Sequence, residues 1–176
     1  IGMIGRAAAI FRVNEIIIYP DNPKVDQTAD MDLIATLLDY METPQYLRKR
    51  LFRLRPELRY AGILPPLRTP HHPLNRKMEN LERGEHREGV TSSKTSEGTL
   101  IDIGVEQPAL IPNRQLAINR RVTVRIMKID ERVRVELANR EQISEYWGYS
   151  VTKDKQSFGK LAKNGSFDLI LSLIHI

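Results

Sequence analysis

The chain has 176 residues and a net charge of +5, and 41% of its residues are hydrophobic, so it can build one packed domain or one domain with a small insert. The absence of cysteine excludes disulfides, thiolate metal sites and thiol nucleophiles, and it fits a reducing compartment. No apolar run reaches the roughly 18 residues that a membrane-spanning helix needs, and no signal peptide is visible, so no membrane association is expected.

The start of the chain indicates a helix followed by a buried strand. Residues 1–11 carry apolar side chains at the 3.6-residue spacing of one helical face. The expected core face consists of Ile4, Ala7, Ala8 and Phe11. The run "EIIIY" over 15–19 is rich in β-branched residues, which is typical of a buried strand in a parallel sheet.

Two more helices and a second strand are predicted next. Asp30 can cap a helix that buries one apolar face. That face consists of Ile34, Leu37, Leu38 and Met41. Thr43 is expected to cap the following helix, with Pro44 at its first position. The segment "RYAGIL", residues 59–64, is interpreted as another buried strand, so the order of elements predicts an α/β layer with a parallel sheet.

The pattern changes after about residue 88 to short, alternating strands, and five are expected up to "YWGYSVTK", residues 146–153. This spacing predicts a small β-barrel, with an OB-like barrel as the leading interpretation. "FDLILSLI", residues 167–174, again has the character of a buried strand. We therefore expect an α/β domain over 1–87, an inserted barrel over 88–153, and a return to the α/β domain over 154–176.

The positive charge is concentrated in one segment. Residues 43–87 hold eleven Lys or Arg and four Glu, a net of +7, whereas the rest of the chain is close to neutral. A local basic patch indicates a polyanionic partner, with nucleic acid first and an anionic membrane second. The alternative is an ordinary solvated helix face.

Three motifs resemble those of the SPOUT class of RNA methyltransferases. They are "IGMIGRAAAIFRVNEIIIY" at the start, "ETPQYLRKRLF" with "GILPPLRTPHH", and "YWGYSV" at 146–151. Their order is similar to the archaeal and eukaryotic branch of that superfamily, in which an OB-like domain interrupts the α/β domain. The resemblance implies a Rossmann-like, normally trefoil-knotted fold, a homodimeric full-length protein, S-adenosylmethionine as cofactor and methylation of rRNA or tRNA.

The resemblance also implies roles for individual residues. Arg6 matches the arginine of the first motif and is expected to be catalytic, by contacting RNA phosphate or by helping to activate the target hydroxyl. The structural alternative is that Arg6 caps a sheet edge or pairs with Glu15. Pro65 and Leu67, in the loop after the second predicted strand, are expected to contact the cofactor. The main cofactor loops of the family follow "FDLIL", whereas this chain ends "SLIHI", so we interpret it as an inactive fragment.

Six residues of the basic segment are expected to bind RNA. They are Arg48, Lys49, Arg53, Arg68, His71 and His72. Neighbours on a helix point about 100° apart, so at least one stripe of these cations is expected to be plain solvated surface. The loop of the two histidines is interpreted either as the rim of an active site, where ligands of parallel sheets bind, or as a rigid structural loop. No metal site is expected, because a third ligand is missing.

Trp147, Tyr146 and Tyr149 could stack on bases, but aromatic residues at such a place more often lie in the barrel core or at the seam between domains, and the core is favoured. The resemblance thus implies an S-adenosylmethionine-dependent RNA methyltransferase, and a cytoplasmic location is expected. The alternative is a non-enzymatic RNA-binding adaptor without a working cofactor site. A protein-binding scaffold is a third interpretation, and it predicts no salt-dependent affinity for RNA.

Overall fold

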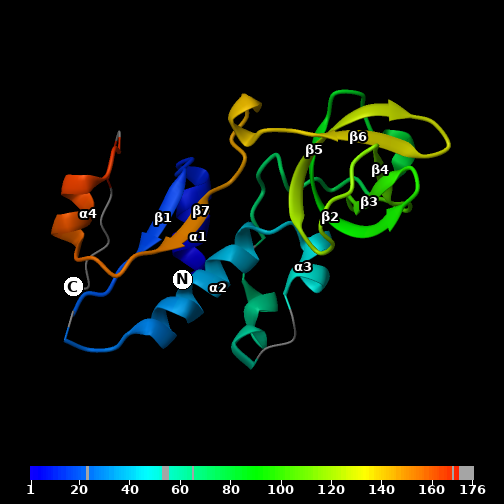
Figure 1. The fold of residues 1–176 in the computed structure, drawn as a ribbon. Helices are drawn as coiled ribbons and strands as arrows, with labels where there is room; N and C mark the ends of the chain where they lie inside the picture. The colour runs from blue at the N-terminus through cyan, green and yellow to red at the C-terminus, as the bar shows by residue number, and fades with distance from the viewer. Residues whose placement is uncertain (23, 53–55, 65, 168, 171–176) are drawn as a thin grey trace.

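The computed structural model describes residues 1–22, 24–52, 56–64, 66–167 and 169–170. Figure 1 shows two parts: an α/β part built from both ends of the chain, and a β-barrel built from its middle. The middle of the chain thus leaves the α/β part, forms the barrel and returns.

The α/β part is organised around a short parallel strand pair. Strand β1 (Glu15–Ile18) lies beside β7 (Ser150–Lys153), in a register that places Glu15 opposite Ser150. The helices of this part are α1 (Gly2–Ile10), α2 (Thr28–Glu42), α3 (Gln45–Leu51) and α4 (Phe158–Asn164). The parallel arrangement expected for the strand at 15–19 is confirmed, and the α1 and α2 helices are too. Helix α4 was not predicted.

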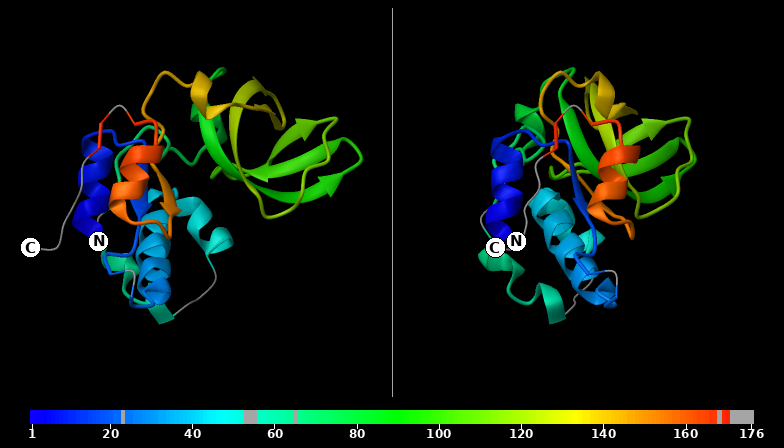
Figure 2. Two further views of the ribbon diagram at one scale, coloured as in Figure 1. Left: turned by 60° about the vertical axis from the view of Figure 1, so that its left-hand side comes forward. Right: turned by 90° about the vertical axis from the view of Figure 1, so that its left-hand side faces the viewer.

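Helix α1 buries its small residues rather than its large apolar ones. Gly5 and Ala8 face the core, and a Cβ atom at Gly5 would lie 2.8 Å from the Tyr149 hydroxyl and 3.2 Å from Leu38 Cδ2. Phe11 is 77% exposed, so the expected core face was wrong except for Ala8. The reason is steric, because only small side chains allow α1 to approach α2 and β7 this closely. Figure 2 shows α1 on the outside of the strand pair.

Three local predictions for residues 28–64 were wrong. Helix α2 begins at Thr28, two residues before the expected Asp30 cap, and Thr43 ends α2 instead of capping α3. The segment 59–64, expected to be a strand, follows the 3-10 helix η1 (Pro56–Leu58) and contains a second 3-10 helix, η2 (Ala61–Ile63). Its backbone bonds are local, from Ile63 N–H to the Tyr60 carbonyl, and Ile63 is 81% exposed. The apolar segment 59–64 therefore forms turns, because it does not pair with a strand of a sheet.

The barrel is closed and has five strands. They are β2 (His86–Thr95), β3 (Gly98–Asp102), β4 (Ala109–Pro112), β5 (Arg121–Ile129) and β6 (Val133–Leu137), in the order β2-β3-β4-β6-β5. All neighbours are antiparallel except β4 and β6, which are parallel. The expected small β-barrel is confirmed. The strand expected at 146–153 is β7, however, and it pairs with β1 instead of joining the barrel.

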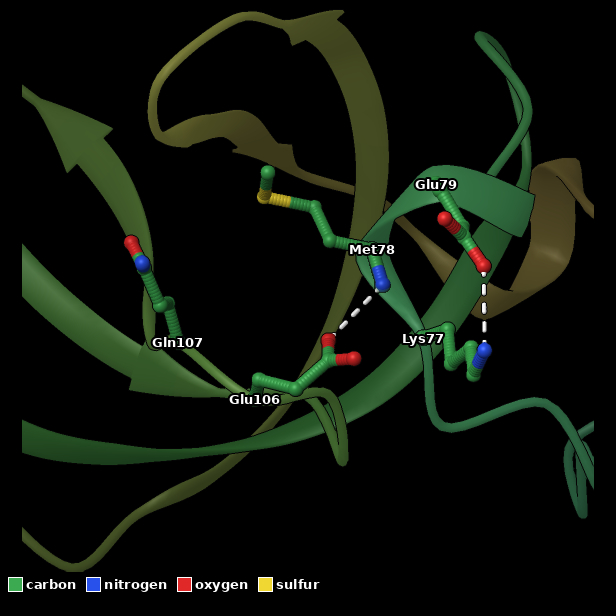
Figure 3. A pocket seen from close by; sticks show the side chains of 5 residues that line it. All are labelled: Lys77, Met78, Glu79, Glu106 and Gln107. Carbon is green, nitrogen blue, oxygen red and sulfur yellow. Dashed lines mark hydrogen bonds and ion pairs between the residues drawn. The ribbon is translucent and has the colours of Figure 1, made fainter.

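The barrel core is filled by alternating apolar residues and closed by a preceding turn. Four of these side chains are at most 1% exposed: Val124, Ile126, Val133 and Val135. The turn η3 (Met78–Asn80) packs Met78 against this core, and Leu81 belongs to it. Figure 3 shows the outer side of that turn, where the Met78 amide donates to Glu106 Oε2 at 2.8 Å.

The predicted strand at 167–174 lies largely outside the described residues, and the described ones among them, 167 and 169–170, form no strand. Within the described parts of the chain, no helix is long and apolar enough to cross a membrane.

Candidate functional site

Ionised side chains are buried together where the barrel meets the α/β part. Glu42 ends helix α2, Glu88 lies on β2, and Arg121 begins β5. The Glu42 and Glu88 side chains are 4% and 3% exposed, and that of Arg121 is 26% exposed. We call this group the junction network. Burying charges is costly unless each is paired and hydrogen-bonded, so the partners of each charge decide what the network does.

Glu42 is the centre of the junction network. Its carboxylate accepts hydrogen bonds from Arg121 Nη1 at 2.5 Å and Arg121 Nη2 at 3.1 Å, and lies 3.1 Å from His71 Nε2. Burial by itself would raise the pKa of Glu42, but the hydrogen bonds from His71 and Arg121 outweigh it and lower the pKa to about 2. Glu42 is therefore a fixed negative charge and is unsuited to proton transfer near neutral pH.

Glu88 is satisfied from the barrel side. Its Oε2 accepts from Arg121 Nε at 2.6 Å, and its Oε1 accepts from the Thr123 hydroxyl at 2.7 Å and from Trp147 Nε1 at 2.6 Å. Trp147 lies on the segment that returns from the barrel to β7 and is 7% exposed. This tryptophan is therefore buried at the seam between the barrel and the α/β part, and its indole N–H donates to Glu88.

The two histidines of the basic segment are held at the end of α2. Nε2 of His71 and Nε2 of His72 donate to the Glu42 main-chain carbonyl, at 2.9 and 2.7 Å. His71 is 0% exposed, so the expectation that it projects from its loop toward RNA was wrong: the free carbonyl and carboxylate of Glu42 draw the ring inward. Burial, aided by the neighbouring His71, lowers the pKa of His72 to about 4, so His72 is neutral near pH 7.

Helix α3 adds further contacts across the same junction. The Tyr46 hydroxyl donates to the Glu88 carbonyl at 2.8 Å, and Arg50 Nε lies 3.0 Å from Asp102 Oδ2 on β3. A Cβ atom at Gly104 would lie 2.6 Å from the Tyr46 ring, and the positive φ of 83° at this position also favours glycine. The barrel is thus attached to the α/β part from α2, from α3 and from the returning segment.

Arg48 is a structural residue in this arrangement. Its guanidinium donates to the Thr43 carbonyl at 2.9 Å and to the Met41 carbonyl at 3.0 Å, and it lies 4.5 Å from the centre of the Tyr40 ring. These carbonyls are at the C-terminal end of α2, where a cation is favourable. The structure therefore gives Arg48 a role in ending α2.

The other residues predicted for the site fall into three groups. Lys49, Arg68 and Arg6 are exposed, and Arg6 makes no hydrogen bond or ion pair with any residue that the structure describes, so the structural alternative of pairing with Glu15 is wrong. Leu67 is 4% exposed and packs in the α/β core. Arg53 and Pro65 lie outside the described residues.

The described residues of the predicted cofactor loop do not form a pocket for S-adenosylmethionine. Leu67 is a core residue, and the polar atoms Thr69 Oγ1 and His71 Nδ1, which lack partners among the described residues, are enclosed by protein. Two open depressions lie on the barrel, away from this loop. In the part of the chain that the structure describes, no three His, Asp or Glu side chains gather as a metal site would need.

Sequence reasoning missed Glu42, Glu88 and Arg121. One signal was available: Glu42 follows Leu38 by four residues and Met41 by one, so it continues the buried stripe of α2. A carboxylate at the end of an apolar stripe requires a buried partner. The partner itself was not predictable, because Arg121 is 79 residues away in the sequence.

The fold and the junction network define an α/β protein that carries a barrel in a fixed orientation. The model of a family described as putative RNA methyltransferase matches residues 1–171, so the chain belongs to this family. The resemblance to RNA methyltransferases that the sequence indicated is thereby confirmed at the level of the family.

Named relatives agree with the family. The chain is 33% identical over 178 residues to a 28S rRNA (uridine-N(3))-methyltransferase of Drosophila melanogaster, and 31% identical over 173 residues to the protein of the same name from Homo sapiens. Each alignment covers 85% of this chain, and they cover 36% and 44% of those relatives. A putative methyltransferase of Caenorhabditis elegans is 31% identical, over 96% of this chain and 52% of that protein. The chain thus spans about half the length of these relatives, or less.

Proposed function

We propose that the chain is part of an S-adenosylmethionine-dependent RNA methyltransferase of the SPOUT class. The observation that carries this proposal is the family match over residues 1–171, together with relatives whose names specify a uridine of 28S rRNA. Ribosomal RNA is accordingly the proposed substrate. We extend the proposal to a cytoplasmic location, with which a chain free of cysteine is compatible.

The barrel is proposed to be an OB-like insert. An OB-fold is a five-stranded Greek-key barrel that binds oligonucleotides. The strand order β2-β3-β4-β6-β5, with a parallel contact between the third and the fifth strand, supports this assignment. The parallel pairing of β1 with β7 around the barrel supports the division into two α/β segments and one insert.

The exposed cations Lys49, Arg68 and Arg6 are the proposed RNA contacts of the α/β part, together with Arg53. His72 is neutral near pH 7, so its proposed contribution is limited to a hydrogen bond. Arg48 already binds two carbonyls of α2, which leaves it less able to hold a phosphate. Arg6 retains its proposed role beside the reacting group, since it is exposed and has no partner in the described part of the chain.

The full-length protein is proposed to be a homodimer. Support comes from the outer face of α1, where Met3, Ile10 and Phe11 are 86%, 63% and 77% exposed. Contiguous exposed apolar side chains of this kind mark surfaces that bind protein.

Calorimetry with S-adenosylmethionine tests the proposal, with this chain and a version extended to the length of its relatives measured side by side. Each protein would also be given an rRNA transcript and a methyl-labelled donor. Binding and label transfer by the extended form are the expected result. If neither form binds the cofactor while both bind RNA in a salt-sensitive manner, the protein is an RNA-binding adaptor. If neither form binds RNA, the scaffold interpretation replaces both.

A further inference from the structure

A β-bulge lies at the distal end of the barrel. The pairing of β5 with β6 shifts its register between Ile126 and Lys128, so Met127 is the extra residue. Ile126 is buried, whereas Met127 and Lys128 both face solvent. Bulges of this kind redirect side chains and are frequent beside binding sites. The turn between β5 and β6 points away from the α/β part (Figure 1).

Like charges face each other next to this bulge. Lys128 on β5 is directly opposite Arg134 on β6, and both are exposed. Like charges in directly opposed positions of an antiparallel pair are destabilising. Asp130, 2.6 Å from Lys128 Nζ, offsets part of this repulsion in the free protein, and an anion bound between the two cations offsets the rest.

A third cation, Arg83, and the apolar side chains of Met127 and Ile129 lie beside Lys128. Arg83, Met127, Lys128 and Ile129 line an open depression of about 400 Å³. Arg83 is exposed and forms no ion pair with any residue that the structure describes. Its turn is bound to β5, because Gly84 N–H donates to the Ile126 carbonyl at 2.8 Å. Met127 is 37% exposed, and a thioether is a favourable contact for an aromatic ring.

Acidic groups lie near these cations in the structure or the sequence, and Glu82, exposed beside Arg83, is one of them. Asp130 Oδ2 lies 2.6 Å from Lys128 Nζ. Glu136 on β6 lies 3.9 Å from Arg125, the residue directly opposite it on β5. In the turn, Glu131 and Arg132 offset each other in charge. Arg83 and Arg134 therefore remain as unpaired positive charges on either side of Met127 and Lys128.

We infer that Arg83, Met127, Lys128 and Arg134 form a binding surface for single-stranded RNA. Arg83 and Arg134 bind phosphates directly, Lys128 adds a third contact when a phosphate replaces Asp130 as its partner, and an unpaired base lies over Met127. The positive charge of the three cations favours a polyanionic ligand. The exposed thioether of Met127 favours a ligand that also carries aromatic groups, as the bases of RNA do. The inference rests on the proposed function, since it assigns a second contact for the same RNA, at the end of the barrel farthest from the α/β part.

Fluorescence anisotropy with a labelled, unstructured oligouridine tests the inference, with the whole chain titrated at several salt concentrations. The triple variant Arg83→Gln, Lys128→Gln, Arg134→Gln is expected to bind at least about tenfold more weakly. Its plot of log affinity against log salt is expected to flatten by about two, since each phosphate contact on a single strand contributes about 0.7. Met127→Ser is expected to weaken binding about threefold without changing that slope.

Two controls separate binding from folding. Lys160→Gln on α4 changes the charge by the same amount per site and is expected to alter the affinity less than twofold. Arg134→Gln is expected to leave the melting temperature unchanged or higher, because it removes the opposed like charges. If the triple variant has the affinity and salt slope of wild type, the surface is not an RNA site and the proposed function stands. If wild type fails to bind RNA at any salt concentration, both fall.

Discussion

Arg121 of the barrel binds Glu42 of α2 through both of its terminal nitrogens, at 2.5 and 3.1 Å, while its Nε binds Glu88 at 2.6 Å. One guanidinium thus neutralises two buried carboxylates that come from different parts of the fold. Hydrogen bonds and charges from Glu42 and Glu88 overcome the cost of burial and raise the pKa of Arg121, so it is charged under all folding conditions.

Removing this guanidinium is expected to be severe. Arg121→Met leaves Glu88 buried without its cation and Glu42 with only Arg140, 3.7 Å away, so the free energy of unfolding is expected to fall by about 3–5 kcal/mol. Urea denaturation followed by circular dichroism measures the change. Arg125→Met, on the same strand, breaks only an exposed pair with Glu136 and is expected to cost less than about 1 kcal/mol. Equal losses in the two variants would contradict the importance of the junction network.

Acid is expected to weaken the junction through Glu42. Its pKa is lowered from 4.5 to about 2 in the folded protein, so its contribution to stability is present above pH 4.5 and is lost as the pH falls toward 2. The contribution corresponds to roughly 3 kcal/mol, at about 1.4 kcal/mol for each pH unit. Urea unfolding at a series of pH values should show this loss in wild type, and a flatter profile between pH 4.5 and 2 in Glu42→Gln. Parallel profiles would show that Glu42 titrates normally.

His72 is expected to stay neutral in moderately acidic solution. Burial lowers its pKa from 6.5 to about 4, so the unfolded chain takes up this proton first and the contribution of His72 to stability falls as the pH falls from 6.5 to 4. Asp39, whose pKa burial raises to about 6, has the opposite effect over much of this range. The direct measurement is therefore the NMR titration of the imidazole. A midpoint near 6.5 would mean that the His72 ring is solvated.

Gly148 is expected to tolerate no side chain. Its φ is 85°, and a Cβ atom would lie 2.6 Å from both Glu42 Oε1 and His71 Cε1. Gly148→Ala therefore combines backbone strain with displacement of the junction network, and we expect a loss of about 2–4 kcal/mol in unfolding free energy. Gly159→Ala on α4 has no atom within 4 Å and is the matched control, with a neutral or slightly stabilising effect expected. Similar thermal melts for both variants would refute the close approach.

The spacing of apolar residues along the chain was sufficient to predict several helices and strands. Alternation identified β5 and β6, and Val124, Ile126, Val133 and Val135 are the buried side of those strands. Helical periodicity located α1 and α2 to within a few residues. The core face of α1 was misjudged because the sequence cannot show how closely a neighbouring helix approaches, and a close approach favours Gly5 over Phe11.

The candidate site could not be predicted in full, because its contacts join residues that are far apart in the sequence. "HH" in a proline-rich loop has the composition of an exposed rim, yet the end of α2 offers an acceptor that buries His71. Arg121 had no distinguishing feature among the basic residues of its strand. A resemblance to a family supplied the class of protein, and Arg6, Lys49 and Arg68 remain predictions about its RNA contacts.

The pairing of β1 with β7 has a consequence for the order of folding. Glu15 must find Ser150, far away in the chain, and forming so distant a contact is slow because the intervening chain loses entropy when its ends meet. The five barrel strands, in contrast, are consecutive between His86 and Leu137. We expect the barrel to form first and to shorten the loop that β1 and β7 must close. In pulse-labelling hydrogen exchange, the amide of Val124 should become protected before that of Ile17. The β1–β7 pair would then form last, and its formation would require that the barrel is already complete.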